Sequence, residues 1–379
     1  MTKRYNKNIR RVIFIGQLPP PHIGPTIATQ IILNSRINKH FELIHLDTSD
    51  HRDISKLGAI DFQNFANAVK DYLKLAILIR KELPSLIYIP ISQTTVGYLR
   101  DSIFILISKI FQKKVLCHLR GGNFRNWYLS SSSLTRWFVR RVHSLVDGQI
   151  VLGECLRRLF QEILPDEKIF VVPNGKNFLD PIYNSNRKKN FYKEKFRILF
   201  LSNLRKEKGL FDVLTAIPEI AGFSRHAEFE FVGEWRDKET KIEFDRFIKA
   251  HDMLPVKLFG PIYGRSKIDL LSSADIFVFP TYYPAEGHPW VIVEAMAAGL
   301  PIITTNQGAI TESVKDGING FIVEKKNPQQ IAEKIKFLIG RPDIRKKMGE
   351  ESRRLYLQNF TEEKMIERLS NAFRAVLSR

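Results

Sequence analysis

The chain has 379 residues, which exceeds the size of one compact core and predicts about two domains. Its apolar fraction of 44% and charged fraction of 26% are typical of globular proteins and exclude an intrinsically disordered chain. The net charge of +19 indicates affinity for polyanions, which include nucleic acid, anionic lipid and phosphorylated substrates.

The two cysteines, Cys117 and Cys155, are too few for a disulfide framework and lack metal-ligand spacing, which favours a reducing compartment. The basic first residues precede an apolar run that is broken at Gly16 and Pro19, too short for a signal peptide. No uncharged apolar run is long enough to cross a bilayer. We therefore expect a cytoplasmic protein, soluble or attached peripherally to the inner face of the cell membrane.

The first half of the chain alternates apolar strands with helical patterns. We expect a turn over residues 16–26 and a helix over 27–33 after the first strand. The first strand is predicted at residues 11–15, and further strands at 41–46, 85–89, 114–119 and 148–152. Further helices are predicted at 64–83, 97–111 and 154–164. Such alternation predicts a doubly wound parallel sheet of the α/β class.

A second α/β series follows the polar, basic stretch 180–195, which we interpret as an interdomain linker. Its strands are predicted at residues 197–201, 228–232, 256–259, 274–279, 300–305 and 320–323, and its helices at 209–217, 240–250, 266–273, 328–338, 343–357 and 361–377. We therefore predict a domain over 1–180 and a second over 181–360, with the helix 361–379 packing back on the first. A cleft between the halves would be the default ligand site.

Residues 283–301 form a loop and a helix between two apolar strands, with Glu286 in the loop and Glu294 on the helix. Both acids follow the carboxyl end of a strand, where ligands bind in open α/β sheets. The loop is rich in small residues and proline, which suits the presentation of backbone N–H groups. The alternative is an ordinary strand-to-helix connection with solvated acids.

This stretch resembles the Glu-x7-Glu signature of GT-B glycosyltransferases, within the retaining, metal-independent family 4, also called glycosyl transferases group 1. The resemblance covers almost the whole chain and is strongest over residues 199–322. It implies that Glu286 contacts hydroxyls of a donor sugar and that Glu294 binds the nucleotide ribose, since a carboxylate can accept two hydroxyl hydrogen bonds. The implied donor-binding loop and helix start contain Gly287, His288, Pro289, Trp290 and Val291. The implied fold is two Rossmann-like domains that face each other across a cleft.

Residues 200–209 resemble the family element G-R-L-x-x-x-K-G. Lys208 matches the lysine that neutralises the donor diphosphate, whereas the position of the family's arginine holds Asn203. Arg205, two residues later, is a candidate for the missing cation, and Asn203 and Arg205 are both predicted to bind the donor. A fixed cation here would stabilise charge on the leaving group. The alternative is a solvated helix start.

Two segments of the first half also resemble family elements. Residues 19–25 resemble P-P-x-x-G-G, but Pro25 has no N–H, so Gly24 or Thr26 must supply any backbone donor. Residues 117–124 resemble H-x-H/R-G, which makes His118 the candidate polar group near the reacting centre. A hydrogen-bonded core histidine is the alternative for His118, and an ordinary strand-to-helix turn is the alternative for residues 16–26.

Two further turns complete the resemblance. Residues 260–264 resemble the loop beside the nucleotide base, where Ile262 would supply backbone contacts. Residues 172–175 match the family's P-N-G turn, and a plain turn is the better interpretation of Asn174.

The resemblance implies a transferase that moves a sugar, with retention, from a UDP-, GDP- or ADP-sugar to a glycan or lipid-linked acceptor. Polysaccharide or glycolipid synthesis is the expected setting, and neither a metal nor another cofactor is implied. In the family's front-face reaction the leaving phosphate oxygen helps to deprotonate the acceptor hydroxyl, so that no side chain acts as nucleophile. Glu286 would orient the donor while Lys208 and Arg205 hold the diphosphate.

Other functions remain open from the sequence. A sugar-nucleotide epimerase on the same fold is one, and a non-catalytic sugar-nucleotide or polyanion binder is another, suggested by Asn203. A phosphorylase would need a lysine-bound pyridoxal and normally a larger chain. A nicotinamide oxidoreductase is disfavoured because no G-x-G-x-x-G follows the first strand.

The acceptor side is less specific. Residues 102–114 are apolar with a basic end, and residues 127–141 place aromatic side chains among cations. Such segments suit an anionic membrane surface, although an apolar helix in an α/β unit is more often core packing. Nucleic acid is not expected, since no basic and aromatic array follows one groove.

Overall fold

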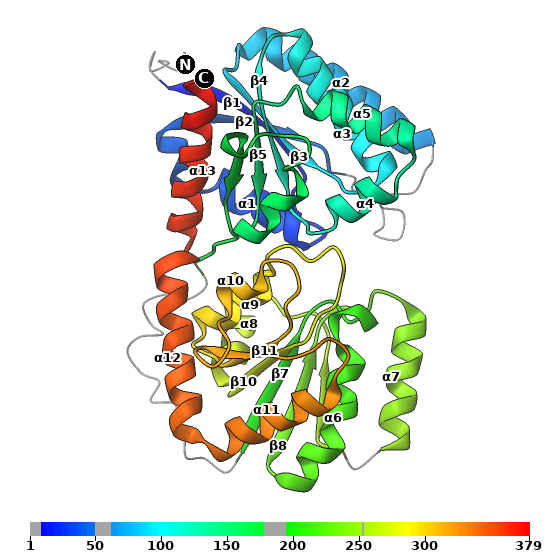
Figure 1. The fold of residues 1–379 in the computed structure, drawn as a ribbon, viewed down its shortest axis with the longest axis vertical. Helices are drawn as coiled ribbons and strands as arrows, with labels where there is room; N and C mark the ends of the chain where they lie inside the picture. Colours follow the sequence, from blue (N-terminus) through cyan, green and yellow to red (C-terminus); the bar gives the residue numbers. More distant parts are fainter. Residues whose placement is uncertain (1–8, 50–61, 178–194, 252–253) are drawn as a thin grey trace. The chain divides into compact units, whose positions relative to one another are not determined.

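The computed structural model describes residues 9–49, 62–177, 195–251 and 254–379 (Figure 1). The chain divides into two compact units, Met1–Asn174 with Glu362–Arg379, and Gly175–Thr361. The predicted linker, residues 180–195, lies outside the described residues except for Lys195.

The first unit contains a six-stranded sheet in the order β2-β1-β3-β4-β5-β6, and its strands pair in parallel. Val12 of β1 lies between Leu43 and Leu86 of the neighbouring strands. The strands read as apolar runs because helices cover the sheet and remove both faces from water. They span Arg10–Gly16 (β1), Phe41–Asp47 (β2), Leu86–Ile91 (β3), Lys114–Leu119 (β4), Gly148–Val151 (β5) and Ile169–Val171 (β6).

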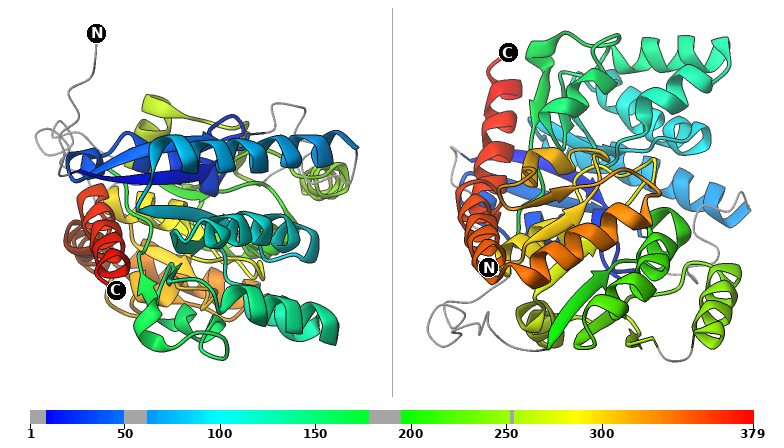
Figure 2. Two further views of the ribbon diagram at one scale, coloured as in Figure 1. Left: turned by 90° about the horizontal axis from the view of Figure 1, so that it is seen from above. Right: turned by 60° about the horizontal axis from the view of Figure 1, so that its bottom comes forward.

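The helices of the first unit are α1 to α5, with α13 from the end of the chain. They span Gly24–Leu33 (α1), Phe62–Glu82 (α2), Thr95–Ile110 (α3), Phe124–Ser130 (α4), Ser133–His143 (α5) and Glu362–Leu377 (α13). Helix α13 packs on this unit, where the Phe373 ring lies 5.2 Å from that of Phe41. The left view of Figure 2 shows α2, α3 and α5 in a row, and Tyr72 of α2 meets Phe104 of α3 with ring centroids 4.9 Å apart.

The prediction of a helix over residues 154–164 is wrong. Only Glu154–Leu159 is helical there, as a 3-10 turn. Pro165 disfavours helical geometry at the residue before it, so the segment has little room for an α-helix. Its apolar side chains Leu156, Leu159 and Phe160 are all buried, which accounts for the apolar pattern without a helix.

His143, the last residue of α5, is fully buried with its ring stacked 5.0 Å from Phe160. Burial lowers the pKa of His143 to about 3, from an ordinary 6.5. Between these values the unfolded chain binds one more proton than the folded chain at this site, so the free energy of unfolding falls as the pH falls.

We expect His143→Phe to flatten this acid sensitivity. The contribution of His143 should make the free energy of unfolding of the wild type about 2 kcal/mol lower at pH 5 than at pH 7. The phenylalanine variant should lack this decrease. Urea unfolding at both pH values measures it. His251→Phe, which changes an exposed histidine, is the control and should behave as wild type. An unchanged pH dependence in His143→Phe would refute the assignment.

The second unit contains a six-stranded sheet in the order β12-β11-β10-β7-β8-β9, also paired in parallel. The chain fills one side of β7 with β8 and β9 and then returns to the other side with β10. The order therefore reverses between β7 and β10, and ligands bind at such a point in doubly wound sheets. The strands span Phe196–Leu201 (β7), Ala227–Val232 (β8), Val256–Phe259 (β9), Ile276–Phe279 (β10), Ile302–Thr304 (β11) and Gly320–Ile322 (β12).

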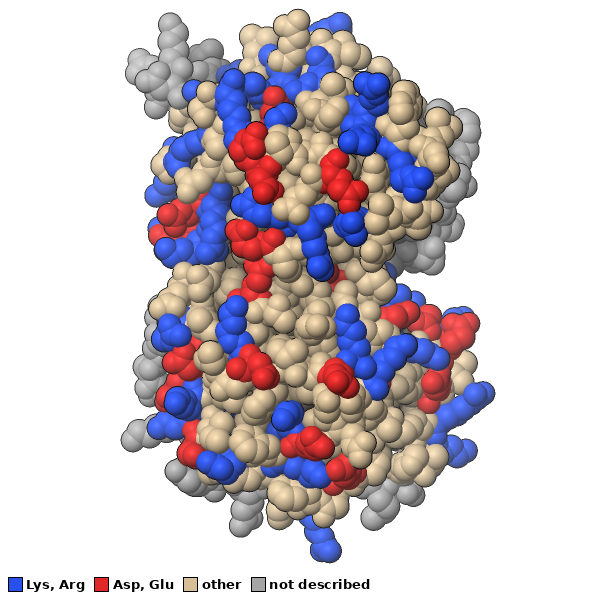
Figure 3. All heavy atoms as spheres, in the orientation of Figure 1, with Lys and Arg blue, Asp and Glu red and all other residues tan. Residues whose placement is uncertain are grey.

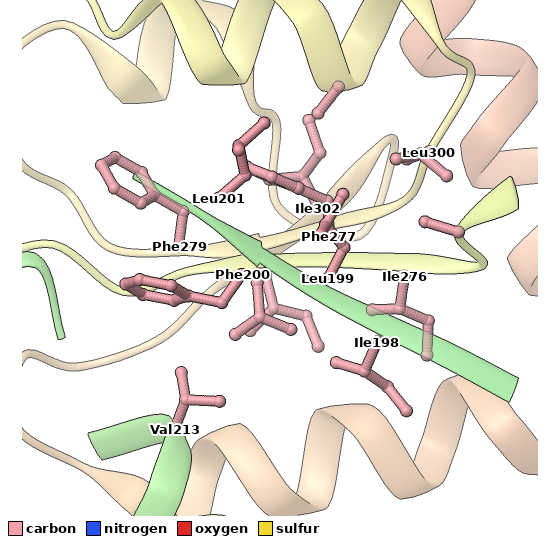
Figure 4. Close-up of a cluster of buried hydrophobic side chains, with 14 of the residues drawn as sticks. Ile198, Leu199, Phe200, Leu201, Val213, Ile276, Phe277, Phe279, Leu300 and Ile302 are labelled. Atoms are coloured by element: carbon pink, nitrogen blue, oxygen red, sulfur yellow. The ribbon is translucent and has the colours of Figure 1, made fainter. Parts of the chain in front are cut away.

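The two central strands carry the core of the second unit. Figure 4 shows Phe200 of β7 and Phe277 and Phe279 of β10 among aliphatic side chains. The surrounding helices span Leu210–Phe223 (α6), Lys238–Ala250 (α7), Gly264–Ser273 (α8), Trp290–Ala297 (α9), Ile310–Ser313 (α10), Pro328–Gly340 (α11) and Pro342–Asn359 (α12). The predicted fold class, two doubly wound parallel sheets, is confirmed.

Candidate functional site

The loops after β7 and β10 meet at the carboxyl edge of the second sheet. Strand β7 leads into a 3-10 turn at Lys206–Lys208, and β10 leads into the loop before α9. The backbone N–H of Tyr282 donates to the Glu207 carbonyl at 2.8 Å, and the Thr281 hydroxyl lies 3.3 Å from the same oxygen. These contacts bring the two sequence-predicted motifs together at the point where the strand order reverses.

Gly209 allows this close approach. Its φ is +80°, and a Cβ at this position would lie 2.4 Å from the carbonyl oxygen of Pro280. A side chain would therefore meet a backbone atom that cannot move aside. The glycine ends the 3-10 turn and begins α6, which leaves Lys208 beside the β10 loop.

Lys208 and Glu286 form an ion pair, with Nζ 2.5 Å from Oε2. The two side chains are only 12% and 10% exposed, and Glu286 also accepts from the Thr281 hydroxyl at 3.2 Å. Charges taken out of water in this way depend on each other for compensation. The predicted cation and the predicted acid thus hold each other at the carboxyl edge of the second sheet.

Arg205, the sequence-based candidate for a second cation, lies near the same aromatic ring as Lys208. The Arg205 guanidinium lies 4.7 Å and the Lys208 ammonium 4.6 Å from the centre of the Tyr283 ring, within the range of cation–π attraction. Glu207 orients Arg205 through a bond of 2.9 Å to Nε. Asn203 is exposed, so Arg205 and Lys208 supply two cations to one aromatic ring.

Glu294 lies on α9 and is 2% exposed. Lys267 of α8 places Nζ 2.5 Å from its Oε2, and Lys176 places Nζ 3.4 Å from its Oε1. The Tyr356 hydroxyl donates to the Lys176 carbonyl and the Lys176 N–H donates to the Phe360 carbonyl, which fixes the backbone of Lys176. Each carboxylate oxygen therefore has its own cation, which offsets the cost of burying the charge.

The sequence reasoning missed Lys176, Lys267 and Tyr283. Lys176 directly follows the predicted P-N-G turn, a weak signal that this turn lies near the site. Tyr283 begins the stretch 283–301 but was given no role, and Lys267 belongs to no motif; only the folded chain brings them to Lys208 and Glu294.

We expect Lys267→Met to destabilise the second unit by about 3 kcal/mol, because it leaves a buried carboxylate oxygen without its cation. The double variant Lys267→Met/Glu294→Gln removes the uncompensated charge and should recover most of the loss. Lys257→Met is the matched control, since Lys257 pairs with Glu228 at the surface. Urea unfolding measures all three, and equal losses in the two single variants would contradict this account.

The remaining predicted residues of the loop and α9 have mixed roles. His288 is buried, and its Nε2 lies 2.6 Å from the Ser313 hydroxyl, so its side chain holds the loop in place. The Gly287 carbonyl accepts from the Ala309 N–H at 2.8 Å. Pro289 caps α9, Trp290 begins it, and Val291 and Ile262 pack partly buried against the core.

Gly24, Thr26 and His118 belong to the first unit. Gly24 begins α1 after β1. The Thr26 hydroxyl lies 2.6 Å from the Pro21 carbonyl oxygen and accepts from the Ile23 N–H at 3.2 Å. The Thr26 side chain thus shapes the turn, and ligand contacts there would fall to backbone N–H groups.

His118 lies at the carboxyl end of β4 and is 2% exposed. The Tyr88 hydroxyl lies 2.6 Å from its Nδ1 and accepts from Arg120 at 2.8 Å. Burial, and then the charge of Arg120, hold the pKa of His118 well below its usual range. The Nε2 atom of His118 has no hydrogen-bond partner among the described residues.

No group of three or more His, Cys, Asp or Glu side chains that could hold a metal ion occurs in the described part of the chain.

Comparison with known proteins gives a family match. Residues 182–355 match the family model described as Glycosyl transferases group 1. The chain is 31% identical to spore coat protein SA of Bacillus subtilis, over 46% of this chain and 48% of that one. It is 30% identical to an uncharacterized glycosyltransferase of Methanocaldococcus jannaschii, over 63% and 62% of the two chains. The chain thus spans about half to three fifths of the length of these curated relatives.

Solved structures extend the similarity of fold. A glycosyltransferase from Rickettsia africae aligns with a TM-score of 0.74 at 16% identity, over 99% of this chain and 100% of that one. HepE of Anabaena, solved in complex with UDP, aligns with a TM-score of 0.72 at 16% identity, over 97% and 100%. At these identities the likeness concerns the fold, and it confirms the predicted GT-B architecture.

Proposed function

We propose that the chain, whose residues 182–355 match the Glycosyl transferases group 1 family model, transfers a sugar from a nucleoside-diphosphate sugar to an acceptor hydroxyl. The observation that carries the proposal is the Lys208–Glu286 ion pair of 2.5 Å at the β7/β10 switch point. The pair places a cation and a hydroxyl acceptor side by side, and a sugar diphosphate carries both complementary groups.

Donor binding would give each member of this pair a new partner. The Lys208 ammonium would move to a phosphate oxygen, and the Glu286 carboxylate would accept from hydroxyls of the sugar. Arg205, which lies near the same Tyr283 ring, would add the second cation. Charge builds on the diphosphate as the bond to the anomeric carbon breaks, so fixed cations there favour the transition state over the bound donor.

Glu294 is proposed to bind the ribose. Lys176 and Lys267 each pair with one of its carboxylate oxygens, and the remaining lone pairs would accept from the ribose hydroxyls. The amino terminus of α9, at Trp290, adds a favourable dipole for a phosphate nearby.

We propose that transfer proceeds with retention and without a metal or other cofactor. The bond between the anomeric carbon and the phosphate oxygen breaks, and the acceptor oxygen bonds to the same face of the sugar. The acceptor proton passes to the leaving phosphate oxygen, so that charge and atoms balance without a side-chain nucleophile. We propose that the Tyr88 hydroxyl donates to Nδ1 of His118. The proton on Nε2 would then donate a hydrogen bond to the substrate.

The acceptor is proposed to be a glycan or a lipid-linked sugar, in the synthesis of a polysaccharide or glycolipid. The chain is 27% identical to the capsular polysaccharide biosynthesis glycosyltransferase CapM of Staphylococcus aureus and 23% identical to a phosphatidyl-myo-inositol mannosyltransferase of Mycobacterium leprae. HepE has been solved with UDP-glucose, which supports UDP as the first nucleotide to test, before GDP and ADP. A cytoplasmic location is proposed because two cysteines are too few for a disulfide framework.

Thermal unfolding in the presence of UDP-, GDP- and ADP-sugars tests the donor. The preferred donor at a hundredfold excess over its Kd should stabilise the protein by about 2.7 kcal/mol, and EDTA should leave that shift unchanged. No stabilisation by any nucleoside-diphosphate sugar would contradict the proposal, and loss of the shift in EDTA would contradict metal independence.

Product analysis separates the transferase from its rivals. A transferase releases nucleoside diphosphate when an acceptor extract is added, whereas an epimerase changes the sugar without acceptor and a binder does neither. The binder hypothesis rests on Asn203, and the nearness of Arg205 and Lys208 to one Tyr283 ring supports the transferase proposal instead.

A further inference from the structure

Three neighbouring helices of the first unit expose apolar stripes. In α3 the side chains Val96, Leu99, Ile103 and Ile110 are exposed, at a spacing that places them on one helical face. The opposite face of α3 holds buried residues such as Phe104 and Ile105. Core packing therefore accounts for one face of α3 and leaves the other in water, and the membrane interpretation of residues 102–114 stays a prediction.

The stripe continues on both sides of α3. Helix α2 exposes Val69, Leu73 and Ile77, spaced four residues apart, and α5 exposes Leu134 and Trp137. The left view of Figure 2 shows the three helices in a row with α3 between α2 and α5. Leu134 is 74% and Ile110 is 77% exposed, values unusual for large apolar side chains gathered on one surface.

We define the helical face as the exposed side chains of α2, α3 and α5. Its charge is strongly one-sided. The acids along residues 66–145 are Asp71, Glu82 and Asp101, the last of which is buried. Exposed basic side chains of the helical face include Lys70, Lys74, Lys81, Arg100, Arg140 and Arg141.

Several of these cations are uncompensated. Lys70, Arg140 and Arg141 have no ion pair with any described residue, whereas Lys74 and Arg100 pair with Asp71 and Asp101. Figure 3 shows Lys and Arg beside Asp and Glu over much of the drawn face. In the second unit, exposed apolar residues such as Phe223, Ile242, Ile318 and Leu357 come from different elements. The combination of apolar stripes with unpaired cations is therefore a property of the helical face.

We propose that the helical face docks on an anionic lipid surface, with the three helices lying in the plane of the membrane interface. The apolar stripes would enter the boundary between headgroups and acyl chains, and Lys and Arg would keep their charges at the level of the anionic headgroups. No helix among the described residues is long and apolar enough to cross a membrane. A second copy of the chain is the less suitable occupant, since it would bring like charges together.

Vesicle sedimentation of the full chain, without any nucleotide sugar, tests the docking. We expect binding to vesicles of phosphatidylcholine with 30% phosphatidylglycerol, weakening as salt is raised, and little binding to phosphatidylcholine alone. Arg140→Gln/Arg141→Gln should lower the partition coefficient about thirtyfold, and Leu134→Ser/Trp137→Ser at least about tenfold.

Matched controls come from the second unit. Phe223→Ser removes an apolar side chain as exposed as Trp137, each at 57%, and Arg246→Gln/Lys249→Gln removes two exposed cations from α7. Both should bind vesicles as wild type does. All variants change exposed residues, and unchanged thermal unfolding would verify their folding.

Three results would overturn the proposal. These are equal binding to neutral and anionic vesicles, equal losses in the variants and their controls, or a dimer in light scattering that the Leu134→Ser/Trp137→Ser variant abolishes. The docking is independent of the proposed transfer reaction. Failure of vesicle binding with an intact donor-induced thermal shift would refute the membrane surface alone.

Discussion

Replacing Glu286 or Lys208 by alanine is expected to lower sugar transfer about a hundredfold to a thousandfold, the scale of losing a charge-stabilising group in a transition state. Glu286→Ala removes the proposed acceptor for the sugar hydroxyls, and Lys208→Ala removes the proposed partner of the diphosphate. The measurement is nucleoside diphosphate released per enzyme in the presence of acceptor, with circular dichroism to verify the fold.

A third variant separates chemistry from stability. Each single change leaves a nearly buried charge without its partner, which costs stability in addition to activity. Lys208→Met/Glu286→Gln removes both charges, so it should unfold later than the single variants and remain inactive.

The neighbouring residue Lys206 provides the control. It pairs with Glu243 at the surface, and Lys206→Ala should leave transfer near the wild-type rate. Normal turnover by either Glu286→Ala or Lys208→Ala would remove the basis of the assignment.

The second large effect is expected at Gly308, where the backbone of one loop crosses another. Gly308 has a φ of +59°, and a Cβ there would lie 2.4 Å from the carbonyl oxygens of both Glu286 and Gly287. Gly308→Ala should therefore cost at least about 3 kcal/mol of unfolding free energy, from backbone strain and the clash together. It should also weaken donor stabilisation, because the segment that must move carries Glu286.

Gly317→Ala is the matched control for the clash. Gly317 has a φ of +70°, yet no atom lies within 4 Å of the position of its Cβ. Its alanine variant should cost about 1 kcal/mol, the strain alone. Denaturant midpoints measure both variants at unchanged m-value, and equal costs would show that the approach of the two loops is not a constraint.

The strand and helix pattern was largely predictable because parallel strands buried on both faces read as apolar runs. The helix predicted at residues 154–164 failed, since burial of Leu156, Leu159 and Phe160 requires apolar residues whether or not an α-helix forms. The apolar run alone could not distinguish these two cases.

The candidate site was predictable only in part. Lys208 and Glu286 came from motifs that resemble a known family, and the sheet order explains why residues 78 positions apart meet. Lys176 lies 118 positions from Glu294, and no local pattern encodes such a contact. Arg205 was a candidate on the sequence, and its placement against Tyr283 required the fold.

The sequence could not separate the exposed helical face from the core for a different reason. Helix α3 is apolar on the side that meets the sheet and again on the side that faces water. Two apolar faces cancel the periodicity that normally separates a buried face from an exposed one. Burial in the folded chain separates them.

The central claim is that the switch point of the second sheet holds the diphosphate of the donor through Lys208. Calorimetric titration of wild type and Lys208→Met with the preferred nucleoside diphosphate tests it most directly, because the titration needs no acceptor. The account predicts a Kd at least about tenfold higher for Lys208→Met, as expected for loss of a hydrogen bond to a charged group. Equal Kd values for the two proteins would contradict it.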